Sequence, residues 1–81
     1  DAVFVGGGGG AALFDMLWQR LVPGARLVAN AVTLETETLL ADLHNRHGGT
    51  LMRFEISEAA PLGGMRGWQP SRPVVQWRVT R

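Results

Sequence analysis

Two short apolar runs, each followed by an amphipathic helix, constrain the fold of this 81-residue chain more than any other feature. The runs cover residues 2–5 and 27–32, and neither alternates between apolar and polar side chains, which is typical of strands covered on both faces of a parallel sheet. Residues 6–10 are all glycine and end the first run, and Pro23 with Gly24 precedes the second. Two successive strand-helix-strand units predict parallel strands with right-handed crossovers.

The periodicity after each run predicts the two helices. The first begins at Ala11 and carries an apolar stripe at spacings of three and four residues: Leu13, Phe14, Leu17, Trp18 and Leu21. The second has Thr33 as its N-cap, acidic residues in its first turn, and His44, Arg46 and His47 before Gly48. Its apolar face is formed by Leu39, Leu40 and Leu43.

Two later segments alternate and predict strands with one wetted face. In the first, Met52, Phe54 and Ile56 are expected to face the core. In the last, the core residues are Val75, Trp77 and Val79. Residues 58–73 contain prolines and glycines without helical periodicity, so we expect a loop or an extended excursion. The predicted fold class is α/β: three parallel strands, two crossover helices and one antiparallel strand that returns beside the third.

Composition excludes several classes of function. Eight basic and seven acidic residues leave a net charge of +1, which gives no single-signed field to attract nucleic acid or an anionic membrane. The chain has no cysteine, so it has no disulfide framework, no thiolate metal site and no cysteine nucleophile. No apolar run approaches the ~20 residues that cross a bilayer, and we expect no contact with a membrane.

Candidate binding residues gather where the predicted parallel strands end, because open parallel sheets bind ligands outside the carboxyl ends of their strands. Gly6, Gly7 and Gly8 follow the first strand, and small residues there let a cofactor approach backbone N–H groups. A dinucleotide site is disfavoured, because Asn30 stands where an acidic residue would hold the ribose. The simpler alternative is a strand-to-helix turn whose glycines relieve crowding.

Polar residues after the second strand extend this edge. Asn30 can donate and accept hydrogen bonds, and Thr33 and Glu35 follow it. A helix cap and a partner for the helix dipole are the simpler roles of Thr33 and Glu35.

The segment 61–73 would join these candidate binding residues if it folds back over the carboxyl edge of the sheet. In it, Arg66, Trp68 and Arg72 could clamp a large anionic substrate, with solvated loop arginines as the commoner alternative. His44 and His47 lack a third ligand at helical spacing, so we expect no metal site. Trp18 and Trp77 are expected in the core or at an interface. The residues alone identify no catalytic group.

Three segments in order resemble a family of cobalamin-pathway methyltransferases: DAVFVGGG at 1–8, LVPGARLVANAVTLE at 21–35 and WQPSRPVVQW at 68–77. The resemblance is to the C-terminal domain of precorrin-6Y C(5,15)-methyltransferase (decarboxylating), which is similar to the separate precorrin C15-methyltransferase/decarboxylase. It covers nearly the whole chain.

This resemblance implies a Rossmann-like class I fold that binds S-adenosylmethionine, of which residues 1–81 supply the last four strands. It implies methylation of a precorrin macrocycle at C15 with loss of carbon dioxide from the C12 acetate, in the cytoplasm and in a homotetramer. Gly6, Gly7 and Gly8 would lie beside the methyl donor, and Asn30, Thr33 and Glu35 near the substrate. The main donor-binding motif would lie upstream, so we expect residues 1–81 alone to be inactive. The alternative is a non-catalytic α/β nucleotide-binding or interaction module.

Overall fold

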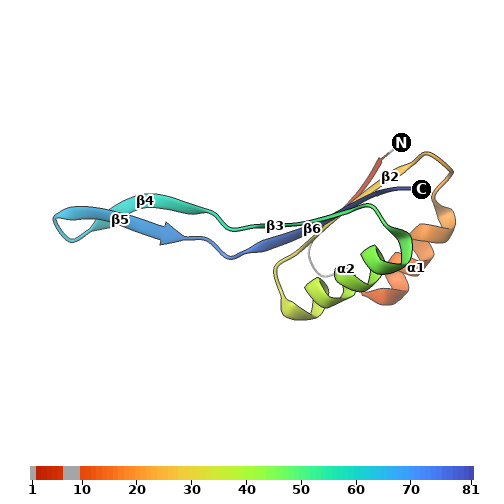
Figure 1. Cartoon of the computed structure of the whole chain (residues 1–81), viewed down its shortest axis with the longest axis horizontal. Helices are drawn as coiled ribbons and strands as arrows, with labels where there is room; N and C mark the ends of the chain where they lie inside the picture. Colours follow the sequence, from red (N-terminus) through yellow and green to blue (C-terminus); the bar gives the residue numbers. More distant parts are fainter. Residues whose placement is uncertain (1, 7–9) are drawn as a thin grey trace.

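The computed structural model describes residues 2–6 and 10–81 and contains a four-stranded sheet, two helices and a long two-stranded arm (Figure 1). The elements, in chain order, are β1 (Ala2–Val5), α1 (Ala11–Arg20), β2 (Arg26–Ala31), α2 (Leu34–His47), β3 (Thr50–Phe54), β4 (Ser57–Leu62), β5 (Met65–Pro70) and β6 (Val74–Thr80). The molecule measures 55 × 24 × 18 Å, and the arm accounts for its elongation.

The four-stranded sheet has the order β1-β2-β6-β3. β1 and β2 are parallel, and β6 runs antiparallel to both β2 and β3, so β1, β2 and β3 share one direction. The prediction of three parallel strands and one antiparallel strand beside the third is therefore confirmed. β6 also lies between β2 and β3, so it is an interior strand, and β3 is the edge strand.

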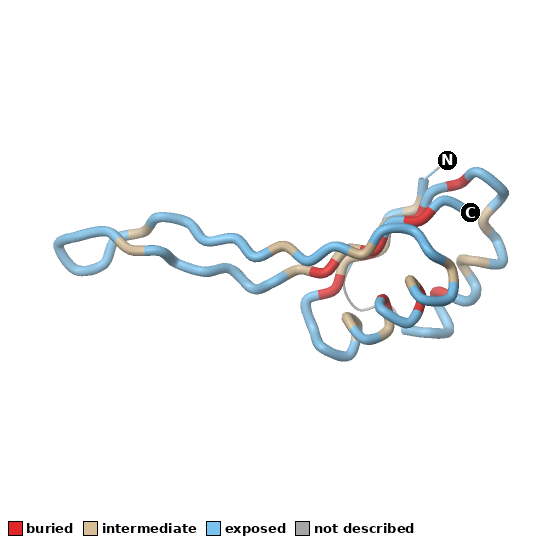
Figure 2. The backbone as a smooth tube through the Cα atoms, viewed as in Figure 1, coloured by how far each residue is buried: buried red, intermediate tan, exposed pale blue. Residues whose placement is uncertain are grey.

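Both helices cover the same face of the sheet and form the core with it (Figures 1 and 2). Phe14 of α1 and Leu40 and Leu43 of α2 pack on the inward side chains of β2 and β6, which are Leu27, Ala29, Ala31, Val75, Trp77 and Val79. Trp77 is only 1% exposed. The predicted core face of the last strand is thus confirmed, and the predicted core positions of both tryptophans agree, since Trp18 packs against this cluster.

The opposite face of the sheet is open, and here the expectation of strands covered on both faces is wrong for the described residues. Side chains alternate along β1 and β2, so that Phe4 and Val28 pair on the open face while Val5 and Ala29 pair on the covered face. Phe4 is 67% exposed. The reason is topological: both helices lie on one side, and the only remaining elements, β4 and β5, leave the sheet altogether.

β3 presents the opposite face to that predicted. Leu51 pairs with Trp77 and packs against the core, whereas Met52 pairs with Gln76 on the open face. Ile56 lies beyond the end of the strand and is exposed. A period-two pattern fits either face of a sheet, and the neighbouring strand β6 decides which set is buried.

The helix ends follow their sequence signals more closely. The Thr33 side chain accepts a hydrogen bond from the backbone N–H of Thr36 at 3.2 Å, which confirms Thr33 as the N-cap of α2. That helix ends at Gly48, as predicted. α1 ends at Arg20, before Pro23, and has no side-chain cap hydrogen bond at Gly10.

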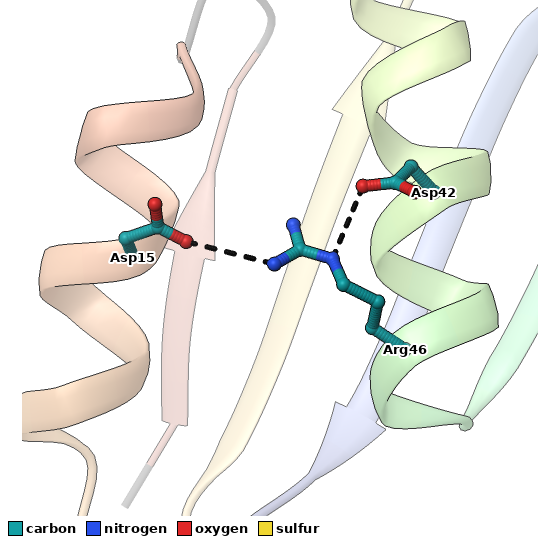
Figure 3. A network of polar contacts seen from close by, with 3 residues as sticks. All are labelled: Asp15, Asp42 and Arg46. Carbon is teal, nitrogen blue, oxygen red and sulfur yellow. Dashed lines mark ion pairs between the residues drawn. The ribbon is translucent and has the colours of Figure 1, made fainter.

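A cation links the two helices on their outer surface (Figure 3). The Arg46 guanidinium lies 3.1 Å from Asp42 on its own helix and 4.0 Å from Asp15 on α1. All three side chains are exposed, so the helices are held together mainly by their apolar contacts with the sheet.

The segment predicted as a loop or extended excursion is an antiparallel hairpin. β4 and β5 pair from Ser57–Pro70 to Leu62–Met65, and Gly63 with Gly64 forms the turn. The backbone N–H of Ser71 donates to the carbonyl of Ile56 at 2.8 Å and closes the base of this arm. The sequence analysis missed these strands because Pro61, Pro70 and the glycines break the alternation that marks a strand.

Candidate functional site

The carboxyl ends of β1, β2 and β3 meet at one edge of the sheet, which is the edge where the sequence placed the binding residues. Gly6 follows β1 directly and is exposed, and a Cβ built on it would meet nothing within 4 Å. The predictions for Gly7 and Gly8 fall outside the described residues. At Gly6, therefore, the described residues leave room on the side where a Cβ would lie.

Asn30 lies near the end of β2 and points to the open face of the sheet. Its Oδ1 accepts a hydrogen bond of 3.0 Å from Nε2 of Gln76 on the neighbouring β6. Among the described residues, no acceptor is bonded to the Asn30 Nδ2 group, which can therefore donate to a ligand. Sequence reasoning missed Gln76, because only the strand order reveals that residues 46 positions apart are neighbours.

Thr33 and Glu35 begin α2, the helix that covers the other face. The Thr33 hydroxyl oxygen caps the helix and lies 3.1 Å from the Thr36 hydroxyl, so its hydrogen-bonding capacity is largely used within the helix. Glu35 is exposed in the first turn. The structure brings Asn30, Thr33 and Glu35 to the same edge, but Asn30 faces away from the helix layer that carries the other two.

The three residues of the predicted clamp are spread along the arm. Arg72 lies at the base of the arm, two residues before β6, while Arg66 and Trp68 lie on β5. Arg66 pairs with Pro61 near the turn, and Trp68 pairs with Ala59 in the middle of the arm. The arm extends away from the sheet and does not fold back over the edge (Figure 1). Only Arg72 therefore lies close to the end of β3.

The histidine positions have a structural explanation. The His47 ring stacks on Trp18 with centroids 3.9 Å apart, and the Arg81 guanidinium lies 4.9 Å from the centre of the same indole. Within residues 2–6 and 10–81, no group of three His, Asp or Glu side chains could hold a metal ion. No helix in these ranges is long and apolar enough to span a bilayer.

A basic hollow of about 580 Å³ lies at the opposite edge of the sheet, where the parallel strands begin. Arg26, Arg78 and His47 contribute to its lining. Sequence analysis gave no signal for it, because these residues come together only through the β2–β6 register and the end of α2.

Comparison with known proteins assigns the chain to a methyltransferase family. Residues 1–81 match the family model of the precorrin methyltransferase domain, and the chain belongs to this family. The chain is 49% identical over its whole length to a precorrin-6Y C(5,15)-methyltransferase [decarboxylating] from Sinorhizobium sp., of which it covers 20%. It is 36% identical over 80 residues to the cobalt-precorrin-6B C(15)-methyltransferase (decarboxylating) of Salmonella typhimurium strain LT2, covering 91% of this chain and 41% of that protein.

The solved structures agree in fold. The crystal structure of the C-terminal domain of precorrin-6Y C5,15-methyltransferase from Rhodobacter capsulatus superposes with a TM-score of 0.94 at 64% identity and covers 99% of this chain. The chain corresponds to 44% of that crystallised domain. The α/β sheet and arm of this chain thus correspond to part of the C-terminal domain of the Rhodobacter protein, and the resemblance identified from the three sequence segments is confirmed.

Proposed function

We propose that this chain is the C-terminal part of an S-adenosylmethionine-dependent methyltransferase domain of the Rossmann-like class I fold, acting on a precorrin in cobalamin biosynthesis. The proposed reaction methylates the macrocycle at C15 and releases carbon dioxide from the C12 acetate. The observation that supports it best is the family match over residues 1–81, together with relatives at 49% and 36% identity that carry decarboxylating methyltransferase names.

The free edge of β1 supports the proposal that upstream residues supply the rest of the sheet and of the binding site. Among the described residues, β1 pairs on one side only, with β2. The relatives are longer, since the chain spans a fifth of the Sinorhizobium protein and 44% of the Rhodobacter domain. Further parallel strands paired with β1 would cover its open edge, and their crossover helices would cover its open face. In this proposal they also carry the main donor site, so residues 1–81 alone do not methylate.

The donor would lie beside the turn that follows β1. When bound, S-adenosylmethionine supplies an electrophilic methyl group. Gly6 fits this role because the described residues leave room on its Cβ side, and we extend the proposal to Gly7 and Gly8. The chain would contribute alignment of donor and substrate rather than a proton-transfer group, since methyl transfer to an electron-rich carbon depends mainly on proximity.

The substrate would lie against Asn30, with Thr33 and Glu35 at the rim and Arg72 as the clamp. The hydrogen bond from Gln76 fixes the orientation of the Asn30 amide. The Asn30 Nδ2 group would then donate a hydrogen bond to a substrate oxygen. A guanidinium group binds a carboxylate in bidentate fashion, and precorrins carry acetate and propionate side chains. Arg66 and Trp68 would reach a bound macrocycle only if it extended along the arm, so Arg72 is the main residue of the proposed clamp. Cytoplasmic location and homotetramer assembly complete the proposal.

A product assay tests the activity. The protein with its upstream sequence is incubated with S-adenosylmethionine and the precorrin-6 macrocycle, and the product is analysed by mass spectrometry. We expect a product that has gained at least one methyl group, including the one at C15, and has lost carbon dioxide, together with S-adenosylhomocysteine. A binding module would instead leave the macrocycle and the donor unchanged.

A further inference from the structure

Three large apolar side chains lie exposed at the carboxyl edge of the sheet. Val32, which follows β2, is 50% exposed, and Leu34, the first residue of α2, is 73% exposed. Ile56, which follows β3, is 59% exposed. Single exposed apolar residues are common, but a group of them at one edge indicates a contact site. We call these three residues the edge cluster.

The start of α2 gives no structural reason for its apolar side chains. In a hydrophobic staple, the residue before the N-cap packs on the fourth residue of the helix. The N-cap of α2 is Thr33, so these two positions are Val32 and Glu37, and a carboxylate stands in place of the apolar partner. Leu34 also lies outside the core cluster of the described residues, which takes its α2 members from later turns.

Hydrogen bonds hold the backbone that carries Leu34. The Thr33 hydroxyl oxygen accepts from the Thr36 N–H at 3.2 Å, and the Thr33 carbonyl accepts from the Glu37 N–H at 2.9 Å. The Leu34 carbonyl accepts from the Thr38 hydroxyl at 2.8 Å. The exposed leucine therefore lies on an ordered turn, and a contact made from ordered backbone costs less conformational entropy on binding.

The sheet register sets the two parts of the edge cluster level with each other. Ala31 of β2 and Arg53 of β3 both pair with Val75 of β6, so β2 and β3 reach the edge together with one strand between them. Neighbouring strands lie about 4.8 Å apart, which separates the two strand ends by roughly 10 Å. A planar macrocycle built from four rings can cover that span.

Polar groups flank the edge cluster. Ser71 donates its backbone N–H to the Ile56 carbonyl at 2.8 Å, which brings the next residue, Arg72, to the β3 end of the cluster. Asn30 lies two residues before Val32 at the β2 end. A precorrin combines an apolar ring with acetate and propionate groups at its periphery. An apolar surface flanked by a guanidinium and an amide matches that chemistry.

Upstream sequence is the other candidate for covering the edge cluster. In the proposed function it pairs with the free edge of β1. The edge cluster instead follows β2 and β3, and in the sheet order β1-β2-β6-β3 it extends from β2 toward the opposite edge strand. This position favours the substrate as the group that covers it.

We infer that Val32, Leu34 and Ile56 position the precorrin macrocycle by apolar contact with its ring, while Arg72 and Asn30 bind its polar groups. The inference rests on the proposed function and adds residues that select for the ring rather than for its charge. The edge cluster is thus a determinant of substrate specificity, because a small anionic compound can bind Arg72 but cannot also cover the cluster.

Fluorescence titration with the precorrin-6 macrocycle, using the protein with its upstream sequence, tests Leu34. Leu34→Gln removes the apolar character of the side chain and should raise the macrocycle dissociation constant at least about fivefold. Leu34→Met keeps an apolar side chain and should stay within about twofold of the wild type. Both should leave the dissociation constant of S-adenosylhomocysteine within about twofold. Equal macrocycle binding by the two variants, or equal weakening of both ligands, would overturn the inference.

Two valines provide a matched control. Val32→Ala should raise the macrocycle dissociation constant at least about threefold, because it removes two methyl groups from the edge cluster. Val22 is similarly exposed, at 57%, but precedes β2 at the opposite edge, and Val22→Ala should leave the constant unchanged. Equal effects of the two substitutions would contradict the inference. A Val32→Ala variant that loses stability but binds the macrocycle normally would show that upstream residues cover the cluster, and the inference would be wrong.

Salt distinguishes the edge cluster from the arginine clamp. The ratio of the Leu34→Gln constant to the wild-type constant should not change between low and high salt. The ratio for Arg72→Ala should fall, because screening weakens an exposed ion pair. A Leu34→Gln ratio that falls with salt would contradict an apolar contact.

The product assay separates this inference from the proposed function. A wild type that forms the methylated, decarboxylated product, while every edge-cluster variant binds the macrocycle normally, rejects the inference alone. A wild type that neither binds nor alters the macrocycle rejects the proposed function and the inference together. Near-ultraviolet circular dichroism checks that each variant is folded.

Discussion

The indole N–H of Trp77 donates a 2.8 Å hydrogen bond to the carbonyl oxygen of Gly48 and so joins the middle of β6 to the end of α2. The Phe14 ring from α1 meets the same indole edge-on, with centroids 6.5 Å apart. One side chain therefore connects both helices to the strand that lies between β2 and β3.

Trp77→Phe should lower the free energy of unfolding by about 1–3 kcal/mol, because it leaves the Gly48 carbonyl without its donor and reduces buried volume. Urea denaturation followed by circular dichroism measures the change. Trp68→Phe is the matched control, since Trp68 is exposed, and should change the free energy by less than about 0.5 kcal/mol. Equal losses for the two variants would contradict the role of Trp77.

Gly49→Ala should be among the most destabilising single substitutions, at roughly 3–5 kcal/mol. Gly49 has φ +86°, and a Cβ there would collide with the Arg78 carbonyl oxygen and lie 2.9 Å from the Val79 Cβ. Gly24→Ala is the control, because Gly24 has φ +89° but open space around its Cβ position. It should cost about 1 kcal/mol, the backbone part alone. Thermal or urea unfolding measures the loss of stability in both variants. The difference between them gives the contribution of the steric collision at Gly49 beyond that of the backbone conformation.

Thr33→Ala should destabilise the chain by about 1 kcal/mol through loss of the α2 N-cap. Thr33→Ser keeps the accepting hydroxyl for the Thr36 N–H and should recover most of the loss. Chemical denaturation measures both, and a serine variant as unstable as the alanine variant would show that the methyl group matters more than the cap.

The sequence was most informative where local signals decide the structure. The Thr33 cap and the end of α2 at Gly48 follow from capping residues and breakers close in the chain. The directions of four strands follow from the connections between them, with or without a helix. The prediction of which face of β3 points inward was wrong. Leu51 and Met52 are both apolar, and only the pairing of Leu51 with Trp77 places Leu51 on the covered face. Likewise, nothing local to Asn30 reveals that Gln76 will lie beside it.

The arm shows the same limit. Its glycines and prolines are loop residues by local criteria, yet Pro61 and Pro70 occupy strand positions whose nitrogen points away from the partner strand. The residues proposed as a clamp were therefore grouped by sequence proximity, while the hairpin separates Arg72 at its base from Arg66 near its turn.

Arg72→Ala in the protein with its upstream sequence should weaken macrocycle binding at least about tenfold, the loss of a charge-assisted bidentate contact, and leave donor binding within about twofold. Arg53→Ala is the control, because Arg53 of β3 pairs at 3.1 Å with Glu55, which directly follows the same strand, and has no part in the clamp. Fluorescence titration with the macrocycle and calorimetry with the donor give the two constants. Equal weakening of both ligands, or of neither, would reject the clamp.

In the proposed function, β1, β2, β6 and β3 complete a methyl-donor site whose other part pairs with the free edge of β1. Calorimetric titration with S-adenosylhomocysteine tests it most directly, using residues 1–81 alone and the same residues joined to their upstream sequence. We expect one saturable site in the longer polypeptide and no measurable binding to residues 1–81 at the same concentrations. Equal affinity in both polypeptides would contradict it.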